Sequence, residues 1–230
     1  MTIAVIVYPG TNCELDVIHA LNLQGAETEM VWHQDTDLTG ASGVVLPGGF
    51  AHGDYLRTGA IARFSPIMDA VARLAADAIP ILGICNGFQI LCEAGLLPGV
   101  LVANRDLRFI CELVHLRVES TDSILTRAAT VGQVLSIPLN SFEGNYVADD
   151  INRIEAEGDV ILRYSDARGS VDHDMSPNGS MNNIAGITNA TRNVAGLMPH
   201  PERASEEILG STDGNVLLEG FIASTELVTV

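Results

Sequence analysis

The 230-residue chain contains no lysine, so its twelve basic residues are all arginines, set against 29 aspartates and glutamates. This absence excludes a lysine Schiff base and the lysine-containing phosphate loop of many nucleotide-binding enzymes. The formal net charge of −17 also argues against nucleic acid as a partner, because such a partner needs a basic patch. We therefore expect an acidic, solvated surface and a chemistry built on other residue types.

Cysteine is scarce, and long apolar runs are missing. The four cysteines, Cys13, Cys85, Cys92 and Cys111, form no C-x-x-C pair, so no zinc knuckle is predicted. No run of 18 apolar residues occurs, so no membrane partner is expected. Residues 1–7 lack the basic region and cleavage site of a signal peptide. These features predict a cytoplasmic protein that needs no disulfides.

The first half of the chain alternates short apolar runs with helical periodicity, which is typical of parallel βαβ units. The length suits one domain spanning residues 1–230. A capping box is predicted at Thr11–Glu14, where the first helix begins. We expect strands over 3–8, 28–33, 44–46 and 80–85, and helices over 14–24, 66–77 and 87–94.

The second half changes character and predicts added antiparallel strands. Alternating stretches are typical of strands that face water on one side, and two runs separated by a turn predict a hairpin. We expect strands over 111–119, 133–139 and 159–164, a loop over 166–183, a hairpin over 184–188 and 194–198, and a helix from 202 to 210. The fold class is therefore α/β, an open and mostly parallel sheet flanked by helices, with antiparallel strands added.

Cys85 is the first candidate for chemistry, in the run Gly83-Ile84-Cys85-Asn86-Gly87. The pattern places a thiol at the sharp turn between a buried strand and a helix, as in a nucleophile elbow. The N-terminus of a helix favours a thiolate over a thiol. Cys85 is therefore a candidate nucleophile, although a buried cysteine is also a common structural residue.

The segment Met198-Pro199-His200-Pro201-Glu202 supplies a candidate base and a carboxylate together. His200 would accept the thiol proton, and Glu202 would fix the tautomer of the imidazole. The alternative is a surface histidine followed by a helix-capping glutamate. The flanking prolines favour a fixed backbone and hence the catalytic interpretation.

Gly48 and Gly49 would leave backbone N–H groups exposed at the end of another strand. Together with the N–H of Asn86 they would form an oxyanion hole at the carboxyl edge of the sheet. His52 lies near this site, whereas the other histidines are interpreted as structural: His19, His33, His115 and His173.

These motifs resemble class I glutamine amidotransferases with a Cys–His–Glu triad. The stretch Gly48–Arg57, the cysteine motif and the segment Met198–Arg203 carry the resemblance, which extends over nearly the whole chain. It implies a flavodoxin-like topology and hydrolysis of glutamine through a thioester on Cys85. It also implies that Gly49 and Asn86 supply oxyanion donors, that Gln89 contacts glutamine or the thioester, and that Gly48 and Phe50 belong to the same substrate-binding set.

Within the family, the chain is most similar to glutaminase subunits that deliver ammonia to an ATP-dependent synthetase of purine biosynthesis. The resemblance implies a large synthetase subunit that binds ATP and Mg²⁺ and converts formylglycinamide ribonucleotide to the amidine, together with a small accessory subunit. It implies no cofactor and no metal on this chain. The chain departs from the family at Ser141-Phe142, where a His-Gly pair is usual.

Two other functions are compatible with parts of this pattern. A free-standing cysteine hydrolase, such as a γ-glutamyl peptidase, would keep the triad and show steady activity without a partner. A catalytically silent scaffold subunit would have lost a member of the triad, and the sequence retains all three.

Overall fold

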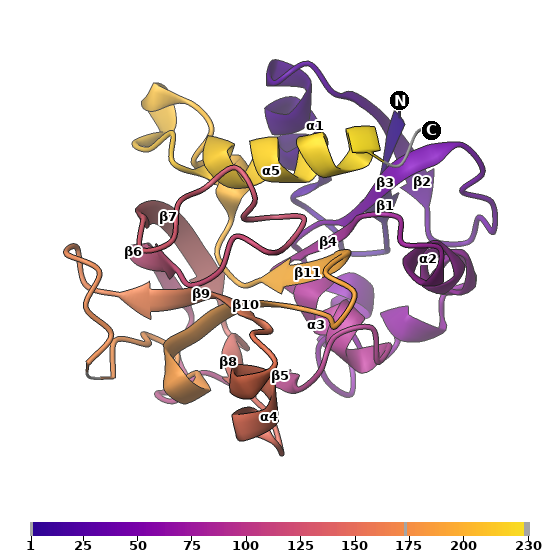
Figure 1. Ribbon diagram of the computed structural model, residues 1–230. Coiled ribbons are helices and arrows are strands. Elements are labelled where there is room, and N and C mark those ends of the chain that lie inside the picture. Colours follow the sequence, from indigo (N-terminus) through magenta and orange to yellow (C-terminus); the bar gives the residue numbers. More distant parts are fainter. Residues whose placement is uncertain (1, 173, 228–230) are drawn as a thin grey trace.

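The computed structural model describes residues 2–172 and 174–227, which build a nine-stranded sheet (Figure 1). The strand order is β2-β1-β3-β4-β11-β10-β9-β6-β7. The sheet strands are β1 (Thr2–Val7), β2 (Glu27–Trp32), β3 (Ala41–Leu46), β4 (Ile81–Ile84), β6 (Ile110–Val118), β7 (Val134–Ser141), β9 (Val160–Ser165), β10 (Ile184–Thr188) and β11 (Val194–Leu197). Two further short strands, β5 (Val100–Val102) and β8 (Asn145–Val147), pair with each other.

The first five strands in this order are parallel, and the remaining four are antiparallel to their neighbours. The helices are α1 (Glu14–Leu23), α2 (Ile67–Ala76), α3 (Asn86–Glu93), α4 (Ile151–Ala156) and α5 (Gly214–Leu227). Helices α1 and α5 lie over one face of the parallel part, whereas α2 and α3 lie on the other (Figure 1). The predicted class, an α/β sheet with antiparallel additions, is confirmed.

The parallel strands β1, β3, β4 and β11 are buried because helices cover both of their faces, which explains their apolar runs, whereas the edge strand β2 is largely exposed. All four residues of β4 are buried, and in β1 only the two terminal residues are partly exposed. The carboxyl ends of β1, β3, β4 and β11 share one edge of the sheet. The candidate residues follow three of these strands, so the topology brings them together as expected.

Two predicted elements are wrong. Residues 202–210 form two short 3₁₀ turns, Pro201–Arg203 and Glu207–Leu209, and the second ends at Gly210 in a left-handed conformation. The long helix α5 follows instead. It is stabilised by the packing of its buried Leu217, Leu218 and Phe221. The capping box at Thr11–Glu14 is also absent: Cys13 is the N-cap residue of α1, and Thr11 instead accepts a hydrogen bond from the N–H of Tyr8.

Among the described residues, no helix is both long enough and apolar enough to cross a membrane. All four cysteines are free, and Cys111 is exposed while the others are buried.

Candidate active site

Cys85 lies at the turn between β4 and α3, in a backbone conformation that residues other than glycine rarely adopt. It is the N-cap residue of α3, with φ 50° and ψ −105°. Its N–H donates to the carbonyl of Leu197 at 2.8 Å, which ties it to the end of β11. Strain of this kind persists where the surrounding structure holds it, and it clusters at functional sites.

The two glycines of the G-x-C-x-G pattern are required by close packing. A Cβ on Gly87 would lie 1.8 Å from the carbonyl oxygen of Leu46, at the end of β3. A Cβ on Gly83 would lie 2.7 Å from the backbone of Gly87. Neither glycine has a positive φ, whereas Cys85 between them does. The glycines therefore let α3 pack tightly against two strands and thereby fix the thiol.

His200 and Glu202 are held together in the interior, beyond the end of β11. The Nδ1 of His200 lies 2.6 Å from Oε1 of Glu202, and their side chains are 2% and 0% exposed. The N–H of His200 donates to the carbonyl of Pro138 on β7, at 2.8 Å. The 3₁₀ turn that begins at Pro201 points the carboxylate back at the imidazole.

The pKa of His200 stands well above its ordinary value. Burial lowers it, but the negative charges of Glu202 and Cys85, and contact with the thiols of Cys13 and Cys85, outweigh that effect. The Nε2 atom makes no hydrogen bond of ordinary length within the described part of the chain. The contact with Cys85 is thus looser than in a closed catalytic complex, a common feature of structures without substrate.

The two glycines that follow β3 have different surroundings. Gly48 packs beneath the imidazole, since a Cβ there would lie 2.7 Å from Cε1 of His200. Gly49 has φ +152° and lines the cavity. The N–H of Phe50 is already bonded to Gly10, at 2.9 Å, so Phe50 contributes its ring to the cavity wall and no oxyanion donor.

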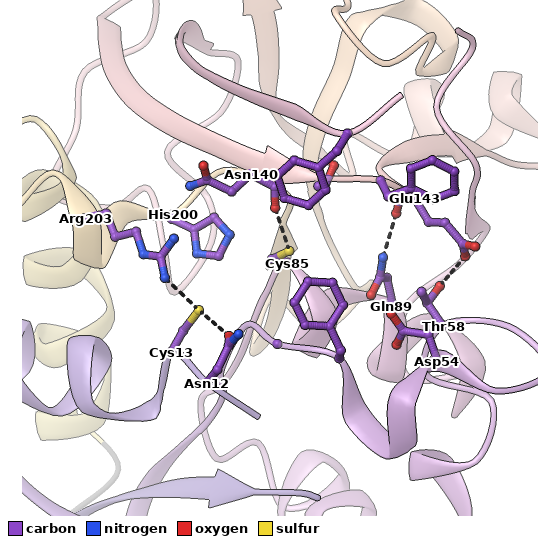
Figure 2. Close-up of a pocket in the computed structure, with 15 residues that line it drawn as sticks. Asn12, Cys13, Asp54, Thr58, Cys85, Gln89, Asn140, Glu143, His200 and Arg203 are labelled. Carbon is purple, nitrogen blue, oxygen red and sulfur yellow. Dashed lines mark hydrogen bonds between the residues drawn. The ribbon is translucent and has the colours of Figure 1, made fainter. Parts of the chain in front are cut away.

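Asn86 and Gln89 form a hydrogen-bonded chain along the first turn of α3. The Oδ1 of Asn86 accepts from the N–H of Ala51 at 3.0 Å, and its Nδ2 donates to Oε1 of Gln89 at 2.8 Å. The Nε2 of Gln89 donates to the carbonyl of Glu143 at 2.6 Å (Figure 2). Both side chains therefore position loops around Cys85. The N–H of Asn86 remains as a donor because the first N–H groups of a helix have no intrahelical acceptor.

A cavity of about 540 Å³ joins these groups. Of the residues predicted from the sequence, it is lined by Gly49, Phe50, Cys85, Gln89 and His200. Sequence reasoning missed most of the other lining residues, which come from loops of both halves of the chain: Asn12, Cys13, Asp54, Thr58, Phe109, Asn140, Glu143 and Arg203. Ser141 and Phe142, the departure from the family pattern, also line it.

An acidic pair lies at one side of this cavity. Asp54 is half-buried, and its pKa is raised to about 6 by burial and by the negative charge of Glu143. Its Oδ1 is buried without a hydrogen-bond partner among the described residues. Glu143 accepts a hydrogen bond from the hydroxyl of Thr58 at 2.9 Å. In Figure 2, Cys85 lies between this pair and His200. The pair is suited to a cationic group of a substrate bound at Cys85.

The remaining described histidines do not line this cavity. His33 bonds Ser65 through Nδ1 at 2.9 Å and packs edge-on against His52, with ring centroids 5.2 Å apart. His19 is exposed and pairs with Glu206. His115 lies within β6, and His173 lies outside the described residues.

Comparison with known proteins places the chain in a family. The model of the CobB/CobQ-like glutamine amidotransferase domain matches residues 1–215. The chain is 49% identical over 227 residues to the phosphoribosylformylglycinamidine synthase subunit PurQ of Salinibacter ruber, covering 97% of each protein. It is 52% identical over 230 residues to the PurQ subunit of Nitrobacter hamburgensis, covering 98% of this chain and 99% of that protein.

Comparison with a solved structure also shows similarity to this family. The chain superposes on one from the PurLQS structure of Thermotoga maritima with a TM-score of 0.86 and 42% sequence identity, covering 96% of this chain and 97% of the other.

Proposed function

The chain belongs to the PurQ branch of the glutamine amidotransferases, and we propose that it is the glutaminase subunit of a phosphoribosylformylglycinamidine synthase. It hydrolyses glutamine to glutamate and ammonia, and the ammonia passes through a protein interior to a synthetase subunit. That subunit converts formylglycinamide ribonucleotide to the amidine at the expense of ATP. The observation that carries the proposal is the strained Cys85 turn, which shares one cavity with His200, the imidazole of the buried His200–Glu202 pair.

The geometry supports nucleophilic catalysis by the thiol. The raised pKa of His200 favours an imidazolium beside a Cys85 thiolate. The thiolate attacks the side-chain carbonyl carbon of glutamine, and the N–H groups of Gly49 and Asn86 stabilise the oxyanion. His200 then gives its proton to the leaving nitrogen, which departs as ammonia and leaves a γ-glutamyl thioester.

The second half of the reaction uses the same groups. His200, now neutral, takes a proton from water as the water oxygen attacks the thioester carbonyl. Collapse of this intermediate releases glutamate and returns the Cys85 thiolate beside the imidazolium. In both halves of the reaction, Glu202 orients the imidazole and stabilises its charged form.

The acidic pair supports glutamine as the substrate. An amino acid bound with its side-chain amide at Cys85 must place an α-ammonium group elsewhere in the cavity. Asp54 and Glu143 offer that group two carboxylates, one of which has an unpartnered buried oxygen. A plain amide without the ammonium group would leave these carboxylates unpaired, which is costly.

We assign ATP and Mg²⁺ to a large, PurL-type synthetase subunit. A thiol, an imidazole and a carboxylate provide every group that the hydrolysis needs, so this chain requires no cofactor for it. We also expect a small PurS-type accessory subunit in the complex, and we expect the complex to work in the cytoplasm. The related structure is that of PurLQS from Thermotoga maritima, which supports a complex of this kind.

The test is reconstitution with a purified PurL-type synthetase and a PurS-type subunit. Amidine formation is measured with glutamine and, separately, with ammonium chloride as nitrogen donor. Cys85→Ala should abolish the glutamine-dependent reaction and leave the ammonia-dependent reaction unchanged, because only the former uses the thiol. Retention of glutamine-dependent synthesis by Cys85→Ala would refute the assignment of the nucleophile. Steady glutaminase activity in the wild-type chain, equal with and without the synthetase, would favour a free-standing hydrolase.

A further inference from the structure

Cys13 is a second thiol beside the proposed catalytic base, and the mechanism above gives it no step. It is 3% exposed and lines the same cavity as Cys85. Like Cys85, it is the N-cap residue of a helix, here the ten-residue α1. The Nη2 of Arg203 donates to its Sγ at 3.2 Å (Figure 2). Helix N-termini and guanidinium groups stabilise thiolates, the form of cysteine that binds metal ions.

Three ligand-type side chains converge at this point. One ligand atom each from Cys13, His200 and Glu202 lies within 4.8 Å of the other two, and all three residues are buried. Thiolate, imidazole and carboxylate are the donors that zinc prefers, at about 2.3 Å for sulfur and about 2.0–2.2 Å for nitrogen and oxygen. Ligands of a tetrahedral ion are therefore about 3.5 Å apart. Shifts on the order of 1 Å would close these residues around an ion.

A second observation indicates that this cluster has unused binding capacity. The Oε2 of Glu202 is buried and lacks a hydrogen-bond partner within the described residues, while Oε1 of the same carboxylate binds the Nδ1 of His200. A buried polar atom of this kind is costly unless a partner satisfies it. The side chain of Glu202 is 0% exposed. A cation beside Cys13 would supply a partner that the protein itself does not.

We propose that Cys13, His200 and Glu202 bind a thiophilic divalent cation of the zinc type, and that the bound ion switches off the thiol chemistry by withdrawing His200 from Cys85. Binding releases the thiol proton of Cys13 and any proton on His200 to solvent, and no electrons are transferred. Arg203 must move aside, and its partly exposed side chain is anchored to Asp16 near the surface. Binding of the metal ion does not depend on the proposed glutaminase function; only the inhibition of the thiol chemistry depends on it.

The experiment measures metal binding directly, on the isolated chain after treatment with a chelator. Co²⁺ serves as the probe because a thiolate ligand gives it a near-ultraviolet charge-transfer band, and Zn²⁺ is then titrated against it. Wild type, Cys85→Ala and the control Cys111→Ser, which changes an exposed thiol, should each bind one ion with affinities within about threefold of one another. Cys13→Ser should bind at least about tenfold more weakly.

The rate of Cys13 alkylation is a second measurement, which leaves Cys13 in place and so remains possible if Cys13→Ser does not fold. Zn²⁺ should slow alkylation of Cys13 at least about tenfold in wild type and in Cys85→Ala, while Cys111 reacts at an unchanged rate. Binding that is lost in Cys85→Ala but kept in Cys13→Ser would place the ion on the nucleophile and overturn the proposal. Failure of the wild-type chain to bind one Co²⁺ or Zn²⁺ ion would also overturn the proposal. These outcomes concern binding alone, so failure of the proposed glutaminase function would leave them unaffected.

Discussion

The imidazole of His200 and the carboxylate of Glu202 share a 2.6 Å hydrogen bond in a place that water hardly reaches, since neither side chain is more than 2% exposed. At this degree of burial, an imidazolium is disfavoured unless a negative charge faces it. Glu202 provides the largest of the charges that raise the pKa of His200 against the effect of burial. The pair therefore sets the pH range in which the proton is available to the leaving ammonia.

Removal of the base should cost far more than removal of the carboxylate. We expect His200→Asn to lower kcat for glutamine hydrolysis by about 10⁶-fold and Glu202→Gln by about 10⁴-fold, because the carboxylate only orients and stabilises the imidazolium. Steady-state glutaminase assays of the complex would measure both. A larger loss for Glu202→Gln than for His200→Asn would reverse the two roles.

The pH profile of Glu202→Gln supplies an independent check. In wild type, the raised pKa of His200 keeps the imidazolium–thiolate pair present until the pH rises well above the ordinary histidine value of about 6.5. Loss of the negative charge lowers that pKa, so the alkaline limb of kcat/KM should move to lower pH. An unmoved alkaline limb would show that another group controls it.

Asp54 should determine substrate affinity more than turnover. We expect Asp54→Asn to raise KM for glutamine by about 10- to 100-fold, with kcat largely retained, because the lost charge faces the α-ammonium. The wild-type KM should rise as the pH falls through about 6, where Asp54 takes up a proton, and the KM of the variant should stay flat. Asp69→Asn, at an exposed position of α2, is the matched control.

A substrate without the ammonium group sharpens this test. Glutaramic acid, which is glutamine without its α-amino group, should be hydrolysed equally poorly by wild type and by Asp54→Asn. If the variant remained slower than wild type toward glutaramic acid, Asp54 would act on something other than the ammonium group.

Gly87 should be intolerant of even one extra carbon. A Cβ there would lie 1.8 Å from the carbonyl oxygen of Leu46, which belongs to the sheet and has little room to move. We expect Gly87→Ala to lower the free energy of unfolding by about 3 kcal/mol or more. Gly25→Ala, where φ is +84° and nothing lies within 4 Å, should cost about 1 kcal/mol. Urea unfolding would compare them, and equal losses would contradict the packing argument.

The sequence was sufficient to predict the parallel half of the sheet and the position of Cys85, because both depend on local signals. Buried strands have continuous apolar runs, and a cysteine between glycines after such a run marks a tight turn. His200 and Glu202 were found because prolines flank them. The capping box at Thr11 was a wrong prediction because a hydroxyl that caps a helix and one that closes a turn have the same local pattern.

The rest of the site depends on contacts between distant segments. Cys13 meets Arg203 across 190 positions of sequence, and Thr58 meets Glu143 across 85. No local pattern carries such information. The predicted helix ends at Gly210, whereas α5 begins at Gly214, because the apolar residues that it buries, Leu217, Leu218 and Phe221, all follow that glycine. The unusual Ser141 lies at the end of β7, where its backbone carbonyl accepts a hydrogen bond from Asn104, and its hydroxyl is buried without a described partner.

The final prediction concerns activation by the synthetase. A glutaminase that works alone would waste glutamine, so we expect low activity in the isolated chain and a large increase on docking. One misaligned oxyanion donor costs roughly 10²–10³ in rate. We expect the N–H of Gly49 to adjust together with the segment 10–12, because Gly49 packs against that backbone, with an ideal Cβ 2.7 Å from the Cα of Thr11. Next to the cavity, after Asp54, the exposed Tyr55 and Leu56 offer apolar surface for a partner, at 75% and 90% exposure.

We therefore expect Leu56→Glu to leave the glutaminase rate of the isolated chain unchanged and to reduce its activation by the synthetase at least about tenfold. The control is Ile208→Glu, because Ile208 is also 90% exposed but lies in the 3₁₀ turn Glu207–Leu209, which contributes nothing to the cavity lining. Glutaminase rates are measured with and without the synthetase, its nucleotide substrates and the small subunit. Equal loss of activation in both variants would contradict docking at Leu56. Wild-type rates that do not change on adding the partners would contradict the activation itself.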